Sequence, residues 1–168
     1  MSSLHIRLAV PSDCPQILYF IQALAEYEKL SHEVHATVPQ LEATLFGARP
    51  CATALLAFEE DTPVGFALFF QSYSTFLARP GIHLEDLFVE PAFRGRGYGK
   101  ALLQALARYT TEKNFGRLEW NVLDWNQPAI DFYLSLDAIP MSEWTTFRLT
   151  GHALKSLAAS HHSSTGKR

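Results

Sequence analysis

Apolar and polar side chains alternate over residues 4–10, a spacing that predicts a strand with one face on a core. Apolar positions then recur every three or four residues over 17–25, which predicts an amphipathic helix. Asp13 followed by Gln16 is typical of a capping box, so we expect this helix to open there and to fade near Glu28.

A second helix and a hairpin are expected next. Thr37 followed three residues later by Gln40 predicts a capped helix that ends before Gly47. Two apolar runs, 51–58 and 64–70, flank a short polar segment, which is typical of two antiparallel strands joined by a turn.

The second half of the chain mixes strands and helices. The expected elements, in order, are a strand over 83–89, a helix after residue 97, a strand over 117–123, a helix from about 128 to 136, a strand over 145–149 and a short helix over 153–159. The strand–turn–helix–strand unit within this order predicts a parallel pair beside the antiparallel hairpin, so we expect an α/β fold. Residues 160–168 are polar and are expected to form a disordered tail.

The composition is that of a soluble globular protein and rules out a disordered chain. Of 168 residues, 48% are hydrophobic and 18% are charged, with a net charge of -3. This charge disfavours nucleic acid as a main partner. The sequence has neither an apolar run long enough to span a membrane nor a secretory signal, so we expect a cytoplasmic protein. Cys14 and Cys51 are interpreted as small buried hydrophobes rather than a disulfide pair.

The turn after the predicted strand over 83–89 is rich in glycine and positive charge. Its three glycines are Gly95, Gly97 and Gly99, and its basic residues are Arg94, Arg96 and Lys100. Glycine lets a ligand approach the backbone, and the amide groups at a helix N-terminus attract anions, so the turn predicts a pyrophosphate cradle. The spacing fits neither a Walker A loop nor the Rossmann fingerprint. The alternative is a flexible surface turn with solvated arginines.

The motif Arg94-x-x-Gly97-x-Gly99 resembles the Gln/Arg-x-x-Gly-x-Gly/Ala loop of the GNAT family of N-acetyltransferases. The order of elements is similar to that fold along almost the whole chain, and the diamine (spermidine/spermine) branch is the most similar. Besides the loop, the segments that carry this likeness are Ile6-Arg7 with Asp13-Cys14, residues 24–28, residues 84–89 and residues 125–133.

The resemblance implies one α/β domain over residues 1–159. Its mixed central sheet of six to seven strands would be flanked by helices and splayed between the fourth and fifth strands, with acetyl-CoA as co-substrate in the wedge. No metal is expected. The implied cofactor-binding residues are Leu87, Phe88, Val89, Arg94, Gly95, Arg96, Gly97, Tyr98, Gly99, Lys100, Asn126, Pro128, Ala129 and Tyr133.

Acetyl transfer to an amine needs a group that removes a proton and a group that protonates the leaving thiolate. The resemblance places Tyr133 as the acid, although a tyrosine can equally be packed on an amphipathic helix. We choose Glu85 as the base, since strand alternation puts Glu85, Leu87 and Val89 on one face and Asp86 on the other. The alternative for Glu85 is a salt-bridged structural carboxylate.

The acceptor is the least defined part of the prediction. Candidate substrate-binding residues are Glu26, Tyr27, Glu85, Glu119 and Asn121, with Glu28 beside them. Surface glutamates are more often simply solvated. The diamine branch carries an acidic residue where this chain has Thr145. This difference argues against a polyamine acceptor and leaves thialysine-like amino acids, other diamines or a small amine open.

Three functions therefore remain. The first is an acetyl-CoA-dependent N-acetyltransferase acting on a small amine, and the second is the same chemistry on a protein N-terminus or lysine. The third is a non-catalytic acyl-CoA sensor, against which the joint presence of Glu85 and Tyr133 argues. The resemblance also implies a homodimer.

Overall fold

The computed structural model describes residues 3–159, and the expected polar tail over 160–168 lies outside the described residues. The chain divides into two compact units, residues 1–125 and residues 126–168. The first unit carries the sheet and the Gly-rich loop. The second carries the C-terminal helices.

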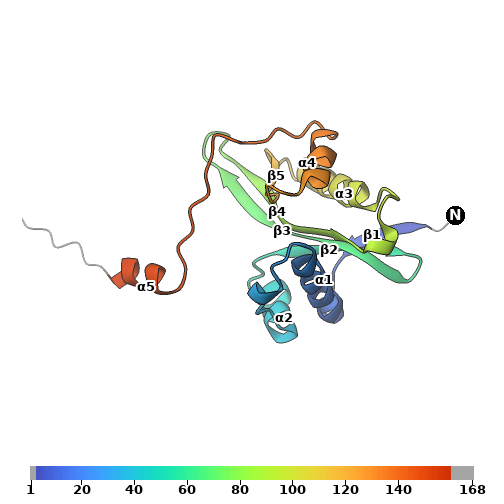
Figure 1. The fold of residues 1–168 in the computed structure, drawn as a ribbon, viewed down its shortest axis with the longest axis horizontal. Helices are drawn as coiled ribbons and strands as arrows, with labels where there is room; N and C mark the ends of the chain where they lie inside the picture. The colour runs from blue at the N-terminus through green and yellow to red at the C-terminus, as the bar shows by residue number, and fades with distance from the viewer. Residues whose placement is uncertain (1–2, 160–168) are drawn as a thin grey trace, which may run out of the picture. The chain divides into compact units, whose positions relative to one another are not determined.

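The first unit is built on a five-stranded sheet of order β1-β2-β3-β4-β5 (Figure 1). The strands are β1 (Leu4–Leu8), β2 (Thr53–Glu59), β3 (Thr62–Ser74), β4 (Arg79–Val89) and β5 (Leu118–Trp120). Neighbours are antiparallel except β4 and β5, which are parallel. The helices are η1 (Pro11–Asp13), α1 (Cys14–Tyr27), η2 (Ser31–Glu33), α2 (Val38–Phe46), η3 (Pro91–Phe93) and α3 (Tyr98–Glu112).

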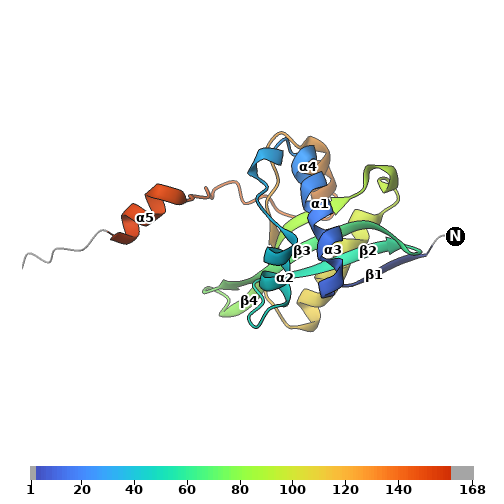
Figure 2. The same ribbon diagram turned by 90° about the horizontal axis from the view of Figure 1, so that it is seen from below.

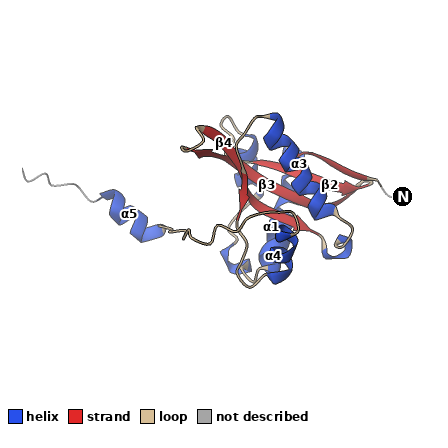
Figure 3. Ribbon diagram, turned by 90° about the horizontal axis from the view of Figure 1, so that it is seen from above, coloured by secondary structure: helices blue, strands red, loops and turns tan. Residues whose placement is uncertain are grey.

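Helices cover both faces of this sheet. Helices α1 and α2 lie on one face and α3 on the other (Figures 1 and 2). Under α1, the ring of Phe20 stacks on Phe66 with 5.4 Å between ring centroids. Under α3, Phe69 meets Tyr109 edge to face at 5.3 Å, beside the fully buried Leu102. These two apolar layers hold the sheet between α1 and α3. Figure 3 shows these helices together with the strands.

The two predicted capping boxes have different outcomes. The one at Thr37 is confirmed, because its backbone N–H donates to the Gln40 side chain over 3.0 Å. The one at Asp13 is wrong: the Asp13 carboxylate makes no cap hydrogen bond to α1. It accepts instead from Arg7, at 2.7 and 2.9 Å, and from the backbone N–H of Val10. A charged donor is a stronger partner than a backbone amide.

The sheet is smaller than expected. Instead of six to seven strands, five are formed within residues 3–159. The expected strand over 145–149 is absent, and β5 is three residues long rather than seven. Alternation predicts a strand only where a neighbouring strand supplies hydrogen bonds, and sequence alone does not reveal that neighbour. The expectation for Cys51 was also wrong, since it is exposed while Cys14 is buried.

The second unit holds α4 (Gln127–Leu134) and α5 (Gly151–Ala159), both predicted from the sequence. Pro128 lies in the first turn of α4, where its missing N–H costs nothing. Across residues 3–159, no helix combines the length and apolar character that crossing a bilayer requires.

Candidate active site

A β-bulge in β4 decides how the candidate site is arranged. The β3–β4 register pairs Leu68 with Asp86 and Phe69 with Leu84, which leaves Glu85 without a partner in the ladder between these two strands. Directly opposed residues share a face, and Leu68 packs on the core beneath α1. Asp86 therefore lies on the α1 face, and the regular alternation assumed for β4 fails at Glu85.

Asp86 is the carboxylate with the most perturbed environment in this region. Burial first, and then the nearby negative charges of Glu85 and Glu28, together raise its pKa to about 6. Burial also raises the pKa of Glu28, just past the last residue of α1. Three carboxylates held close together around a partly buried position favour a cation in their midst.

Sequence reasoning missed Asp86, although a signal was present. Two adjacent acids in an otherwise apolar strand are costly, and the argument applied to Glu85 applies equally to its neighbour. Alternation already puts Asp86 on the face opposite Glu85, Leu87 and Val89, and that face, which Asp86 shares with Phe88, is the one that α1 covers. Glu85 itself is exposed, and its carboxylate lies 3.8 Å from Nε2 of His83.

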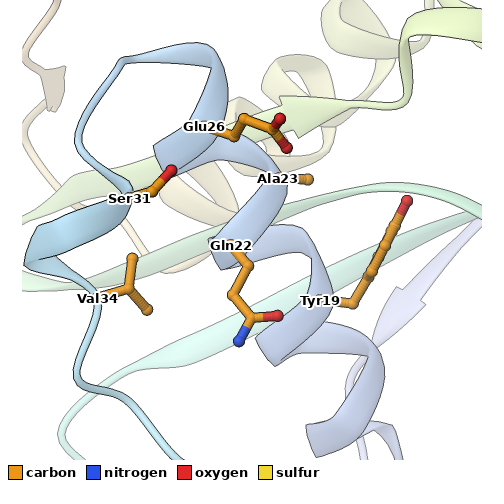
Figure 4. A pocket seen from close by; sticks show the side chains of 6 residues that line it. All are labelled: Tyr19, Gln22, Ala23, Glu26, Ser31 and Val34. Carbon is orange, nitrogen blue, oxygen red and sulfur yellow. The ribbon is translucent and has the colours of Figure 1, made fainter.

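The three candidates at the end of α1 have different neighbours. The negative charge of Glu28 raises the pKa of Asp86. The ring of Tyr27 lies under the Arg94 guanidinium, 4.8 Å from the ring centroid, and 6.2 Å from the ring of Trp125. Glu26 lies in a different place, which Figure 4 shows.

Glu26 lines a surface pocket of about 390 Å³ between α1 and the η2 region (Figure 4). The other lining residues are Tyr19, Gln22, Ala23, Ser31 and Val34. A hydrogen bond to the Glu90 carboxylate raises the pKa of the Tyr19 phenol. Asp86 does not line this pocket, so Glu26 does not belong to the Asp86 group.

The Gly-rich loop has the backbone geometry of an anion cradle. Gly95 and Gly97 have φ of 76° and 84°, in the left-handed region that favours glycine. A Cβ built at either position would meet nothing within 4 Å, so the surface beside the loop is open. Gly97 is the N-cap of α3 without a side-chain cap, which leaves the first-turn N–H groups for an anion.

The basic residues of this loop mostly bind protein groups. Nε of Arg94 donates to the Val89 carbonyl over 2.9 Å. Arg96 forms an ion pair with Glu59 at 3.1 Å, and the Tyr98 hydroxyl donates to the same carboxylate over 2.9 Å. The arginines therefore tie the loop to β2 and β4, and the backbone is its main anion-binding surface.

The predicted separation of β4 and β5 is present. The parallel ladder runs from Ile82 with Leu118 to Leu84 with Trp120, and β4 continues without β5 to Val89. Along this stretch β4 still pairs with β3, where Phe88 faces Phe66. The other edge of residues 85–89 is therefore not paired with β5, as backbone pairing with a ligand requires.

The remaining candidates are placed as follows. Glu119 on β5 pairs with Nε of Arg117 at 3.1 Å, and Asn121 is exposed just after β5. In the second unit, the Asn126 side chain caps α4 by accepting from the Ala129 N–H over 3.4 Å. Tyr133 is in the last turn of α4, with its ring 5.4 Å from that of Phe132.

Comparison with known proteins identifies the family. The profile of the Acetyltransferase (GNAT) family matches residues 18–137, more than two thirds of the chain. The chain is 38% identical to a thialysine N-epsilon-acetyltransferase of Sus scrofa, covering 94% of this chain and 99% of that protein. It is 33% identical to an L-ornithine N5-acetyltransferase of Arabidopsis thaliana, covering 91% and 87% respectively.

A solved structure shares the fold. An integron cassette protein of V. cholerae superposes with a TM-score of 0.79 at 26% identity, covering 95% of this chain and 99% of that one. The chain belongs to the GNAT acetyltransferase family, as its loop motif indicated, and it is an acyltransferase enzyme.

Proposed function

We propose that this enzyme transfers the acetyl group of acetyl-CoA to a primary amine of a small basic acceptor, namely a diamine, a polyamine or a lysine-like amino acid. The observation that carries the proposal is the partly buried Asp86 carboxylate with Glu28 and Glu85 around it. The similarity to ornithine and thialysine acetyltransferases supports the same acceptor class.

The loop residues fit the donor. Acetyl-CoA supplies an activated acetyl thioester and a diphosphate. The N–H groups from Gly95 to Lys100 would hold the diphosphate, because two left-handed glycines and the start of α3 point several amides to one open side. The edge of β4 that β5 leaves open, at Leu87, Phe88 and Val89, would align the pantetheine amides, although the Val89 carbonyl already accepts from Nε of Arg94.

The acidic group fits the acceptor. An alkyl amine with a pKa near 10.4 is neutral in only about one molecule in 2,500 at pH 7, so it arrives as an ammonium ion. That scarcity corresponds to roughly 4.6 kcal/mol. Asp86 and Glu28 receive the ammonium, and Glu85, which is solvent-exposed, takes the proton to water.

Tyr133 completes the proposed chemistry as the acid that protonates the departing thiolate. A phenol with a pKa near 10 is a weaker acid than a thiol with a pKa near 8.5, so full proton transfer is uphill by roughly 2 kcal/mol. Tyr133 would therefore stabilise the departing sulfur by donating a hydrogen bond, and the phenolate left after any transfer would regain its proton from solvent. Homodimer formation and a cytoplasmic location stay predictions.

The direct test is release of free thiol from acetyl-CoA against a panel of small diamines, polyamines, basic amino acids and short peptides. Release with small basic amines, and not with peptides, is the expected result. Release with peptides alone would indicate a protein acetyltransferase. Tight coenzyme A binding without any release would indicate an acyl-CoA sensor.

A further inference from the structure

Lys29 directly follows Glu28, one of the three carboxylates of the proposed acceptor site, and carries the opposite charge. Its ammonium lies over the ring of Trp125, 5.1 Å from the ring centroid. Among the described residues it forms no ion pair with a carboxylate. The ring of Trp125 packs against Tyr27, the last residue of α1, so Lys29 lies beside this pair of aromatic rings.

The backbone at Lys29 is held in a conformation that lysine disfavours. Its φ is 62°, and the Leu30 N–H donates to Ala25 while the Lys29 N–H donates to Glu26. This pattern is a Schellman cap, in which the left-handed residue is usually glycine because a Cβ there costs energy. A lysine at this position gives up that stability, and its ammonium is held over Trp125, which packs against Tyr27.

The charges on Glu28 and Lys29 are complementary to an amino-acid head group. The Glu28 carboxylate lies near enough to Asp86 to raise its pKa, and the next residue, Lys29, holds its ammonium over the ring of Trp125. A diamine offers such a cation nothing to bind. An α-amino acid with a basic side chain offers a carboxylate a few bonds away from its amines.

We infer that Lys29 is a specificity-determining residue that binds the α-carboxylate of an amino-acid acceptor and so favours basic amino acids over the corresponding diamines. This inference rests on the proposed function and narrows its acceptor class. It assigns Lys29 to acceptor choice and leaves the proton transfers to the groups named above.

The test compares acceptors that differ only by the carboxylate: L-ornithine with putrescine, and L-lysine with cadaverine. The quantity measured is the ratio of kcat/KM for the amino acid to kcat/KM for its diamine. Lys29→Met is expected to lower this ratio about tenfold, the effect of losing one charge-assisted hydrogen bond. Lys29→Arg is expected to restore most of it.

Two further variants separate charge from structure. Lys113→Met is the matched control, since Lys113 also follows a helix and lies over an aromatic ring, Tyr109, at 5.0 Å; its ratio should equal that of the wild type. Lys29→Gly relieves the left-handed strain, so it should melt at a higher temperature than Lys29→Met and yet show the same loss of ratio.

The outcomes distinguish this inference from the proposal beneath it. Two results would overturn the role of Lys29 and leave the proposed function standing. One is an unchanged ratio in Lys29→Met, and the other is a ratio that changes with the melting temperatures of the Lys29 variants and not with the charge at this position. A wild type that acetylates diamines and refuses both amino acids also overturns only this inference. Failure to acetylate any amine of the panel overturns both.

Discussion

Leu68 on β3 faces Asp86 on β4, and the residue between Asp86 and the next paired position is left out of the ladder. Asp86 shares the α1 face with Phe88, whereas the bulge puts Leu84, which pairs with Phe69, on the opposite face. On that face Asp86 lies near enough to Glu28 for the two negative charges to repel, while its sequence neighbour Glu85 is exposed.

Replacing Asp86 by asparagine is expected to stabilise the fold at neutral pH. The folded-state pKa of about 6 is above the ordinary value of 3.8, so the folded state binds the proton more tightly than the unfolded state. Stability falls as pH rises between these values and is lowest once Asp86 is ionised. The full penalty is about 3 kcal/mol.

Urea unfolding of wild type and Asp86→Asn should therefore show a gain of roughly 1–3 kcal/mol for the variant at pH 8 and little difference at pH 4. Asp61→Asn is a suitable control because Asp61 is exposed in the β2–β3 turn. A variant less stable than the wild type at pH 8 would mean that the Asp86 carboxylate has a stabilising partner.

Replacing Glu59 by glutamine is expected to raise the KM for acetyl-CoA about three- to tenfold with little change in kcat. Glu59 binds both Arg96 and Tyr98, so losing its charge loosens the loop whose amides hold the diphosphate. Glu60→Gln, one residue further in the turn, should leave this KM unchanged. A lower KM in Glu59→Gln would instead assign Arg96 to the phosphates.

Replacing Tyr133 by phenylalanine is expected to lower kcat at least tenfold while coenzyme A affinity, measured by calorimetry, stays the same. The phenol contributes when the thiolate departs and adds nothing to ground-state binding. Tyr73→Phe is the control, because Tyr73 is 61% exposed on the β3–β4 hairpin. Equal turnover in wild type and Tyr133→Phe would remove this residue from the mechanism.

Replacing Asp13 by asparagine is expected to cost about 1–2 kcal/mol at pH 7. The hydrogen bonds from Arg7 hold the pKa of Asp13 below 3.8, so this contribution is present above that pH and is lost as pH falls through the folded-state pKa. The cost, measured by denaturant unfolding, should shrink at pH 3. A constant cost across this range would show that the charge is irrelevant.

Much of this fold follows from local pattern. The hairpin, the capped helix at Thr37 and the helix after Gly97 are all set by side chains near in sequence, and each is formed. The loop motif also identified the family, and one of its two glycines, Gly97, has the left-handed φ that favours glycine.

What failed depends on distant partners. The Asp13 carboxylate accepts hydrogen bonds from Arg7 instead of capping α1. The segment over 145–149 pairs with no neighbouring strand among the described residues and forms no strand. Asp86 was missed because alternation separates the two faces of β4 without showing which of them α1 covers. The placement of Glu59 against Arg96, 37 residues away, likewise has no signature in either segment alone.

The ratio of acceptor kcat/KM between wild type and Asp86→Asn, followed from pH 5 to pH 9 with one basic amine, tests the acidic acceptor site most directly. This ratio cancels the ionisation of the amine itself. We predict a ratio of about 10 to 100 at pH 8 that falls toward one below pH 6, as Asp86 becomes protonated in the wild type. A ratio near one at every pH would contradict the account.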